Sequence, residues 1–137
     1  MEDELQYIVS FDSGGKPLEG GKNYKLHLQP DIPARNFWSV IVYDSQNRLM
    51  IHTDQLWPSV YSNSKNLIIN HDGSVDVWFG PEIQAGKENN CIKTILGKGW
   101  TMILRLYGPL ESWFNKTWKP GEIEPIIKST GENFGKP

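Results

Sequence analysis

The residues that could carry out covalent chemistry are few in this sequence. Cys91 is its single cysteine and is followed by Ile-Lys, with no evident histidine partner. A G-x-S-x-G pattern, which would place a serine nucleophile on a strand-to-helix turn, is absent. Hydrolysis by a serine or cysteine nucleophile therefore finds no support, and the sequence identifies no catalytic residue.

Metal and acid–base sites are equally incomplete. His27, His52 and His71 fall on three separate segments and form no H-x-H pair. A bound metal ion needs several such side chains within bond distance of one point. We therefore predict no metal and no cofactor, with His71 a loop residue.

Paired carboxylates are the third possible chemistry, since glycoside hydrolysis uses two of them at roughly 5–9.5 Å across a cleft. Asp76 alternates with Val75 and Val77, which predicts a solvent-facing strand position. Asp44 ends an apolar run and is expected to cap the turn after it, a structural role. The other candidates show no pairing in sequence: Asp54, Glu82 and Glu88.

Tryptophan is the most informative residue type, with six in 137 residues. Exposed tryptophan faces bind sugar rings and also favour protein interfaces. Trp57 lies in a polar segment near Tyr61, and Trp78 shares a strand face with Asp76, so we predict Trp57, Tyr61 and Trp78 as candidate ligand-binding residues. The remaining tryptophans are expected to pack in the core or against it: Trp38, Trp100, Trp113 and Trp118.

Arg105 is the fourth candidate ligand-binding residue. It lies in the apolar run WTMILRLY, on the face of Ile103 and Tyr107, the latter predicted to be structural. An arginine in that setting must be paired or must extend its head group to solvent. Two interpretations remain open, a buried ion pair with Asp44 or an anchor for an anionic ligand.

The elements that position these side chains are predicted to be strands, because apolar residues alternate at period two through much of the chain. Helical spacing occurs over PLESWFNK, residues 109–116. Asp72-Gly73 predicts a hairpin turn between strands at 67–70 and 75–79. We predict an all-β fold, a jelly-roll-like antiparallel β-sandwich of about seven or eight strands with one short helix near the C-terminus.

Length and charge define the class further. The chain suits a single domain over residues 1–137, with a polar tail at 126–137. A net charge of −2 offers no basic face for nucleic acid. No apolar run approaches the ~18 residues of a membrane span, and the first ten residues lack signal-peptide features. We expect a soluble domain, cytoplasmic by default, with neither nucleic acid nor membrane as a partner.

Several short landmarks occur in an order that resembles a known family. They are Tyr24–Leu28, residues 37–44, 72–74 and 104–109, Asn90 with Thr94 and Gly97, and Trp118-Lys119-Pro120. Over about residues 7–125 the chain resembles the bacterial domain of unknown function 1214. The resemblance implies a jelly-roll-like sandwich, usually the C-terminal part of longer proteins, and no agreed catalytic residues. Cys91 stands where that family tends to show tryptophan.

Two function hypotheses follow. The first is a non-catalytic β-sandwich module, an accessory or structural domain that binds a protein partner, a second copy, a carbohydrate or a small molecule. The alternative is a domain of a hydrolase-like enzyme acting on a glycan or a polar small molecule. Because the sequence shows no complete set of catalytic residues, the non-catalytic module is favoured. A pocket joining Arg105, a histidine and a carboxylate would support the second.

Overall fold

The structure is a computed structural model that describes residues 3–47, 49–51, 53, 55, 58–83 and 85–126. The elements are β1 (Glu4–Val9), β2 (Tyr24–Leu28), β3 (Ala34–Asp44), β4 (Ser59–Tyr61), β5 (Val75–Gly80), the 3₁₀ turn η1 (Glu88–Asn90), β6 (Cys91–Lys93), β7 (Trp100–Pro109), α1 (Glu111–Phe114) and β8 (Glu124–Pro125). They confirm the predicted all-β sandwich with one short helix near the C-terminus.

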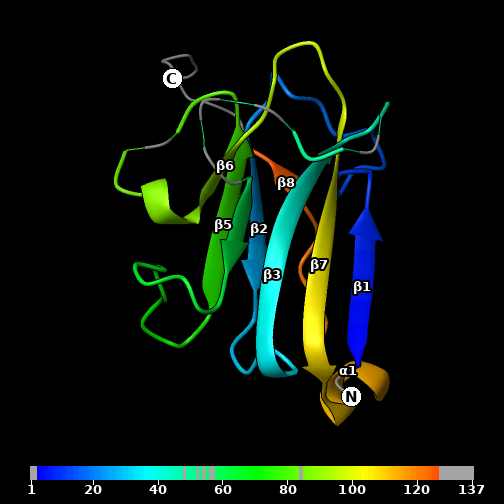
Figure 1. Ribbon diagram of the computed structural model, residues 1–137, viewed down its shortest axis with the longest axis vertical. Coiled ribbons are helices and arrows are strands. Elements are labelled where there is room, and N and C mark those ends of the chain that lie inside the picture. The colour runs from blue at the N-terminus through cyan, green and yellow to red at the C-terminus, as the bar shows by residue number, and fades with distance from the viewer. Residues whose placement is uncertain are drawn as a thin grey trace.

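The strands form two four-stranded sheets that face each other (Figure 1), in the orders β1-β7-β3-β4 and β6-β5-β2-β8. The pairs are antiparallel except β5 with β6, which is parallel. The structure differs from an entirely antiparallel sandwich at this one pair, because the connection through η1 carries the chain back to the same end of the sheet before β6 begins. The jelly-roll connectivity stays a prediction.

Alternation along the strands builds the core. In β2 the side chains of Tyr24, Leu26 and Leu28 are fully buried, whereas those between them face solvent. Trp100, at the start of β7, stacks on Phe79 at 4.8 Å between ring centroids and meets Tyr24 edge-on at 5.5 Å. Other buried core residues between the sheets include Trp38, Val40, Val42, Met102, Leu104 and Leu106.

The predicted hairpin is present only in part. Gly73 adopts a φ of 92°, and its amide donates to the carbonyl of Asn70, so the turn forms. Residues 67–70 do not form a strand. Instead the buried Asn90 side chain accepts a hydrogen bond from the Ile68 amide and donates to the carbonyls of Ile68 and Asp76, at 2.9 Å each. The Asn90 side chain thus forms the hydrogen bonds with the Ile68 backbone that a neighbouring strand would otherwise form.

Gly20 lies against the loop that precedes β7. Its carbonyl accepts a hydrogen bond from the Thr94 hydroxyl at 2.7 Å, and a Cβ on Gly20 would overlap the carbonyl oxygen of Ile95. We expect Gly20→Ala to lower the free energy of unfolding by roughly 2–3 kcal/mol in urea denaturation. Gly14→Ala is the control, since its Cβ would meet only Asp12 Oδ1 at 3.4 Å. Equal stability of the two variants would contradict the close approach of Gly20 to the Ile95 carbonyl.

Three aspartates, Asp12, Asp44 and Asp72, organise turns by accepting hydrogen bonds from groups that follow them in sequence. Such bonds favour the ionised carboxylate. The pKa of each lies below its ordinary value of 3.8, and the main causes are the Lys16 amide for Asp12, the Gln46 amide for Asp44 and the Ser74 hydroxyl for Asp72.

These lowered pKa values predict loss of stability in acid. A carboxyl whose folded pKa lies below its unfolded value stabilises the fold above about pH 5, and this contribution disappears as the pH falls through the folded pKa. We expect Tm, followed by circular dichroism, to decline from about pH 5 to pH 3. Asp44→Asn should show a smaller decline than the unmodified protein, and identical declines would contradict the role of this carboxylate.

Candidate functional site

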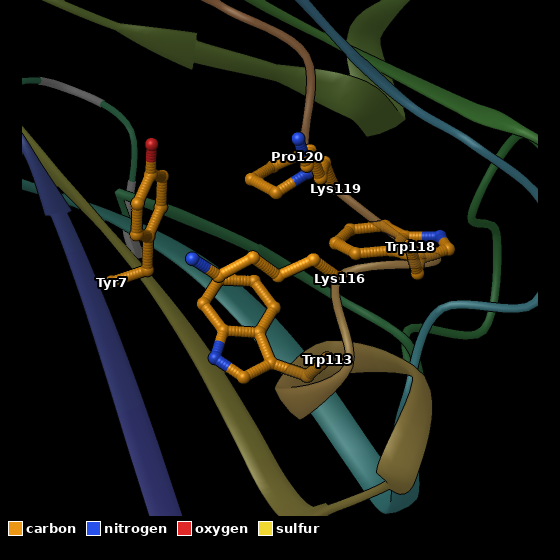
Figure 2. Close-up of a pocket in the computed structure, with 6 residues that line it drawn as sticks. All are labelled: Tyr7, Trp113, Lys116, Trp118, Lys119 and Pro120. Atoms are coloured by element: carbon orange, nitrogen blue, oxygen red, sulfur yellow. The ribbon is translucent and has the colours of Figure 1, made fainter.

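A pocket opens at the side of the sandwich, between β1 and the segment that follows α1 (Figure 2). Its volume is about 320 Å³. We call it the aromatic pocket. It is lined by Tyr7, Trp113, Lys116, Trp118, Lys119 and Pro120.

Tyr7 and Trp113 form two adjoining aromatic walls of the aromatic pocket. Tyr7 is opposite Leu104 in the β1–β7 register, on the core side, but β1 is the edge strand of its sheet, so the Tyr7 side chain remains 38% exposed. Trp113 comes from α1, and its ring meets that of Tyr7 edge-on, with centroids 5.5 Å apart. The two walls are therefore apolar surfaces that are only partly covered.

Trp118 fixes the floor of the aromatic pocket. It is only 4% exposed, and its indole Nε1 donates to the carbonyls of Gln29 and Pro30 at 3.2 and 3.1 Å. Its ring centroid lies 6.2 Å from that of Trp113. These contacts hold the chain after α1 against the loop between β2 and β3.

Two lysines add positive charge to the aromatic pocket. Lys116 has a φ of 64°, in a turn that Asn115 supports by accepting hydrogen bonds from the amide and hydroxyl of Thr117. Figure 2 shows the Lys116 amino group pointing toward the Tyr7 side of the pocket. Neither Lys116 nor Lys119 forms an ion pair within the described residues. The pocket can therefore hold an apolar or ring-shaped group beside an anion.

The predicted ligand-binding residues lie elsewhere in the fold. Trp57 is outside the described residues. Tyr61, 43% exposed on β4, and Arg105 on β7 both face outward from the same sheet, each opposite Ser39 of β3. The structure thus brings Tyr61 and Arg105 to one face, away from the aromatic pocket.

The hypothesis of an ion pair between Arg105 and Asp44 is wrong. Arg105 donates to the Tyr43 hydroxyl at 3.1 Å, and its Nε lies 3.4 Å from a Glu4 carboxylate oxygen. Asp44 is opposite the buried Trp100, on the core side of the sheet, and its carboxylate lies 3.6 Å from the Lys98 ammonium. Alternation along the strands therefore puts Arg105 and Asp44 on opposite faces.

Trp78 faces outward from the other sheet. The ammonium groups of Lys87 and Lys25 lie 5.0 and 6.0 Å from its ring centre, within range of cation–π attraction. Its neighbour in the β5–β6 register is Cys91, which is buried. A ligand stacked on Trp78 would have to displace a lysine.

Asp76, predicted to face solvent, lies on the outward face of β5 but is mostly covered. Its carboxylate lies 2.7 Å from His27 Nδ1 and accepts a hydrogen bond from the Asn70 amide at 3.0 Å. This pair, in which His27 is exposed and Asp76 is mostly covered, is the one His–Asp contact found in the described part of the chain. Within that part, no three His, Cys, Asp or Glu side chains gather as a metal site would require.

Tyr7, Lys116, Lys119 and Pro120 were not anticipated as site residues, and Trp113 was expected only to pack. The sequence does carry a signal, because two tryptophans, two lysines and a proline lie within residues 113–120. Tyr7 carries no comparable signal, since strand alternation alone places it in the core.

By its architecture this protein is a two-sheet β-sandwich with an aromatic pocket beside the edge strand β1. The chain belongs to the family described as Protein of unknown function (DUF1214), which matches residues 3–111. The match includes Tyr7 and ends before Trp113, so the remaining pocket residues lie beyond it. No curated protein matches the chain significantly in sequence.

Two solved structures share the fold. The crystal structure of the VPA0106 protein from Vibrio parahaemolyticus has a TM-score of 0.77 and 23% identity, over 91% of this chain and 31% of that one. A putative uncharacterized protein from Burkholderia cenocepacia has a TM-score of 0.54 and 18% identity, over 90% of this chain and 29% of that one. This chain thus spans about a third of the length of either protein.

Proposed function

We propose that this domain is a non-catalytic binding module whose recognition site is the aromatic pocket. The ligand carries an apolar or ring-shaped group, which packs against the exposed surfaces of Tyr7 and Trp113, and a negatively charged group near Lys116 and Lys119. The observation that supports this most directly is the presence of two lysines without ion-pair partners among the described residues, beside two partly exposed aromatic rings. Unpaired cations beside apolar surface favour an anionic, amphipathic ligand.

The alternative, a hydrolase-like enzyme, has less support than the binding role. It called for Arg105, a histidine and a carboxylate in one pocket. Arg105 faces outward from the β1-β7-β3-β4 sheet, whereas the pair of His27 and Asp76 lies on the β6-β5-β2-β8 sheet. Among the described residues these groups do not meet, which supports the binding role; His52 lies outside the described residues.

The proposal is tested with an aromatic sulfonate, 8-anilinonaphthalene-1-sulfonate, and with uronic-acid oligosaccharides beside their neutral counterparts. We expect saturable binding of the sulfonate, with a change in tryptophan fluorescence because Trp113 and Trp118 line the pocket. Anionic saccharides should bind about tenfold more tightly than neutral ones. Binding of the sulfonate without any saccharide would exclude the carbohydrate class, and no binding of either would contradict the proposed site.

A further inference from the structure

The open edges of the two sheets differ in how they are protected. Natural proteins keep edge strands short, cover them, or place proline in them to avoid pairing with other chains. The described strand β4 has three residues, and β8 has two, one of them Pro125. On β6 the Gln55 side chain bonds the Cys91 carbonyl and the Lys93 amide. Among the described edges, β1 with six residues stands out as long and open.

The register of β1 shows which backbone groups are open. The Gly108 amide of β7 donates to the Asp3 carbonyl, which puts the odd-numbered residues of β1 in hydrogen bonds with β7. Backbone groups alternate in direction along a strand, so Glu4, Gln6 and Ile8 point theirs away from the sheet. Farther along, the Ser10 carbonyl accepts from the Leu18 amide. The chain therefore begins to pair on this side and stops short of Ile8.

The surface along this edge suits an extended chain. The aromatic pocket lies on one side of Tyr7, and a second groove of about 250 Å³ lies on the other, between β1 and residues 121–123. Ile8 is 60% exposed beside this groove, and Phe11 is also exposed. Two side chains on one face of a strand are about 6.8 Å apart, so a single strand could reach both sites.

Charge along the groove indicates a direction. Lys116 and Lys119 line the aromatic pocket in the segment that follows α1, and Figure 1 shows α1 beside the start of β1, whereas Glu122 lines the second groove. The bridge between Phe11 and Pro17 is antiparallel, as is the pairing of β1 with β7. A strand added in that sense would run from the second groove toward the lysines.

We propose that β1 binds an extended segment of another polypeptide by strand addition, antiparallel to β1. The segment places an apolar side chain in the second groove and, two or more residues further along, an acidic side chain or a terminal carboxylate near Lys116 and Lys119. This inference rests on the proposed function, since it names the ligand of the aromatic pocket. Main-chain hydrogen bonds to Glu4, Gln6 and Ile8 supply the added contacts.

The test begins with a displayed library of random nonapeptides, selected on the full chain. We expect enrichment of peptides with an apolar residue followed toward the C-terminus by an acidic one. Synthetic copies with single backbone N-methyl groups should lose affinity by about tenfold at alternate positions only, because every second amide faces β1. In the complex, hydrogen exchange of the Gln6 and Ile8 amides should slow, while that of Tyr7 stays slow with or without peptide.

Protein variants provide a second arm. Ile8→Pro removes an amide that faces away from β7 and should weaken peptide binding much more than Ile8→Thr, which keeps the amide and changes only the side chain beside the second groove. If Ile8→Pro fails to fold, the methylated peptides still decide the question.

Failure of the inference is distinguishable from failure of the proposed function. Peptide binding that Trp113→Ala abolishes but N-methylation leaves unchanged would contradict strand addition and retain the pocket. If no peptide is enriched but the sulfonate still binds, strand addition is likewise contradicted and the aromatic pocket is retained as a binding site. A dimer in which the Gln6 and Ile8 amides are protected without peptide would make a second copy the occupant and overturn the proposal.

Discussion

Trp118→Ala is expected to lower the free energy of unfolding by about 3–5 kcal/mol, the largest effect of any change in the site. The side chain is buried, and its removal leaves a cavity beneath Trp113 while the carbonyls of Gln29 and Pro30 lose their donor. Urea denaturation followed by circular dichroism measures the change. Because the floor of the aromatic pocket is lost, binding should disappear as well.

Trp118→Phe separates packing from hydrogen bonding at this position. It keeps an aromatic ring and removes the indole N–H, so the expected cost is about 1–2 kcal/mol. If Trp118→Ala were as stable as the unmodified protein, Trp118 would not hold the segment after α1 in place, and the aromatic pocket would not be a fixed feature of the fold.

Trp113→Ala is expected to reduce ligand binding by about tenfold or more, because it removes a whole wall of the aromatic pocket. Its cost in stability should be smaller than that of Trp118→Ala, since Trp113 is only partly buried. Titration of 8-anilinonaphthalene-1-sulfonate measures the loss of binding.

Phe114→Ala is the matched control for that experiment. Phe114 follows Trp113 in α1, but it is 58% exposed and does not line the aromatic pocket. Its replacement should leave binding unchanged. Equal losses in the two variants would assign the effect to the short helix as a whole rather than to the Trp113 ring.

The fold could be predicted from the sequence because strand alternation is a local property. In β2 and β7 the apolar residues at every second position are the ones that are buried. The strand predicted at 67–70 does not form, because the Ile68 amide and carbonyl bond to the side chain of Asn90, which is distant in sequence. The parallel pair of β5 and β6 likewise depends on the path of a loop and not on any local pattern.

The candidate site could not be predicted in the same way. Tyr7 and Trp113 meet only because β1 is an edge strand and α1 packs beside it. Neither feature can be predicted from the residues next to Tyr7 or Trp113 in sequence. Arg105 shows the opposite error. Its charge within an apolar strand favours a ligand-binding role, but Glu4 and Tyr43 contact Arg105 on the outward face of the sheet. Exposure and pairing are tertiary properties, so residue type alone could not rank these positions.

The most direct test of the binding role is a titration of 8-anilinonaphthalene-1-sulfonate into the double variant Lys116→Gln/Lys119→Gln. Lys25→Gln/Lys87→Gln, which changes the two lysines near Trp78, is the control of equal charge. If the aromatic pocket binds anionic amphipathic ligands, the first variant should lose affinity by about tenfold and the second should not. Equal affinities of both variants and the unmodified protein would contradict the proposed function.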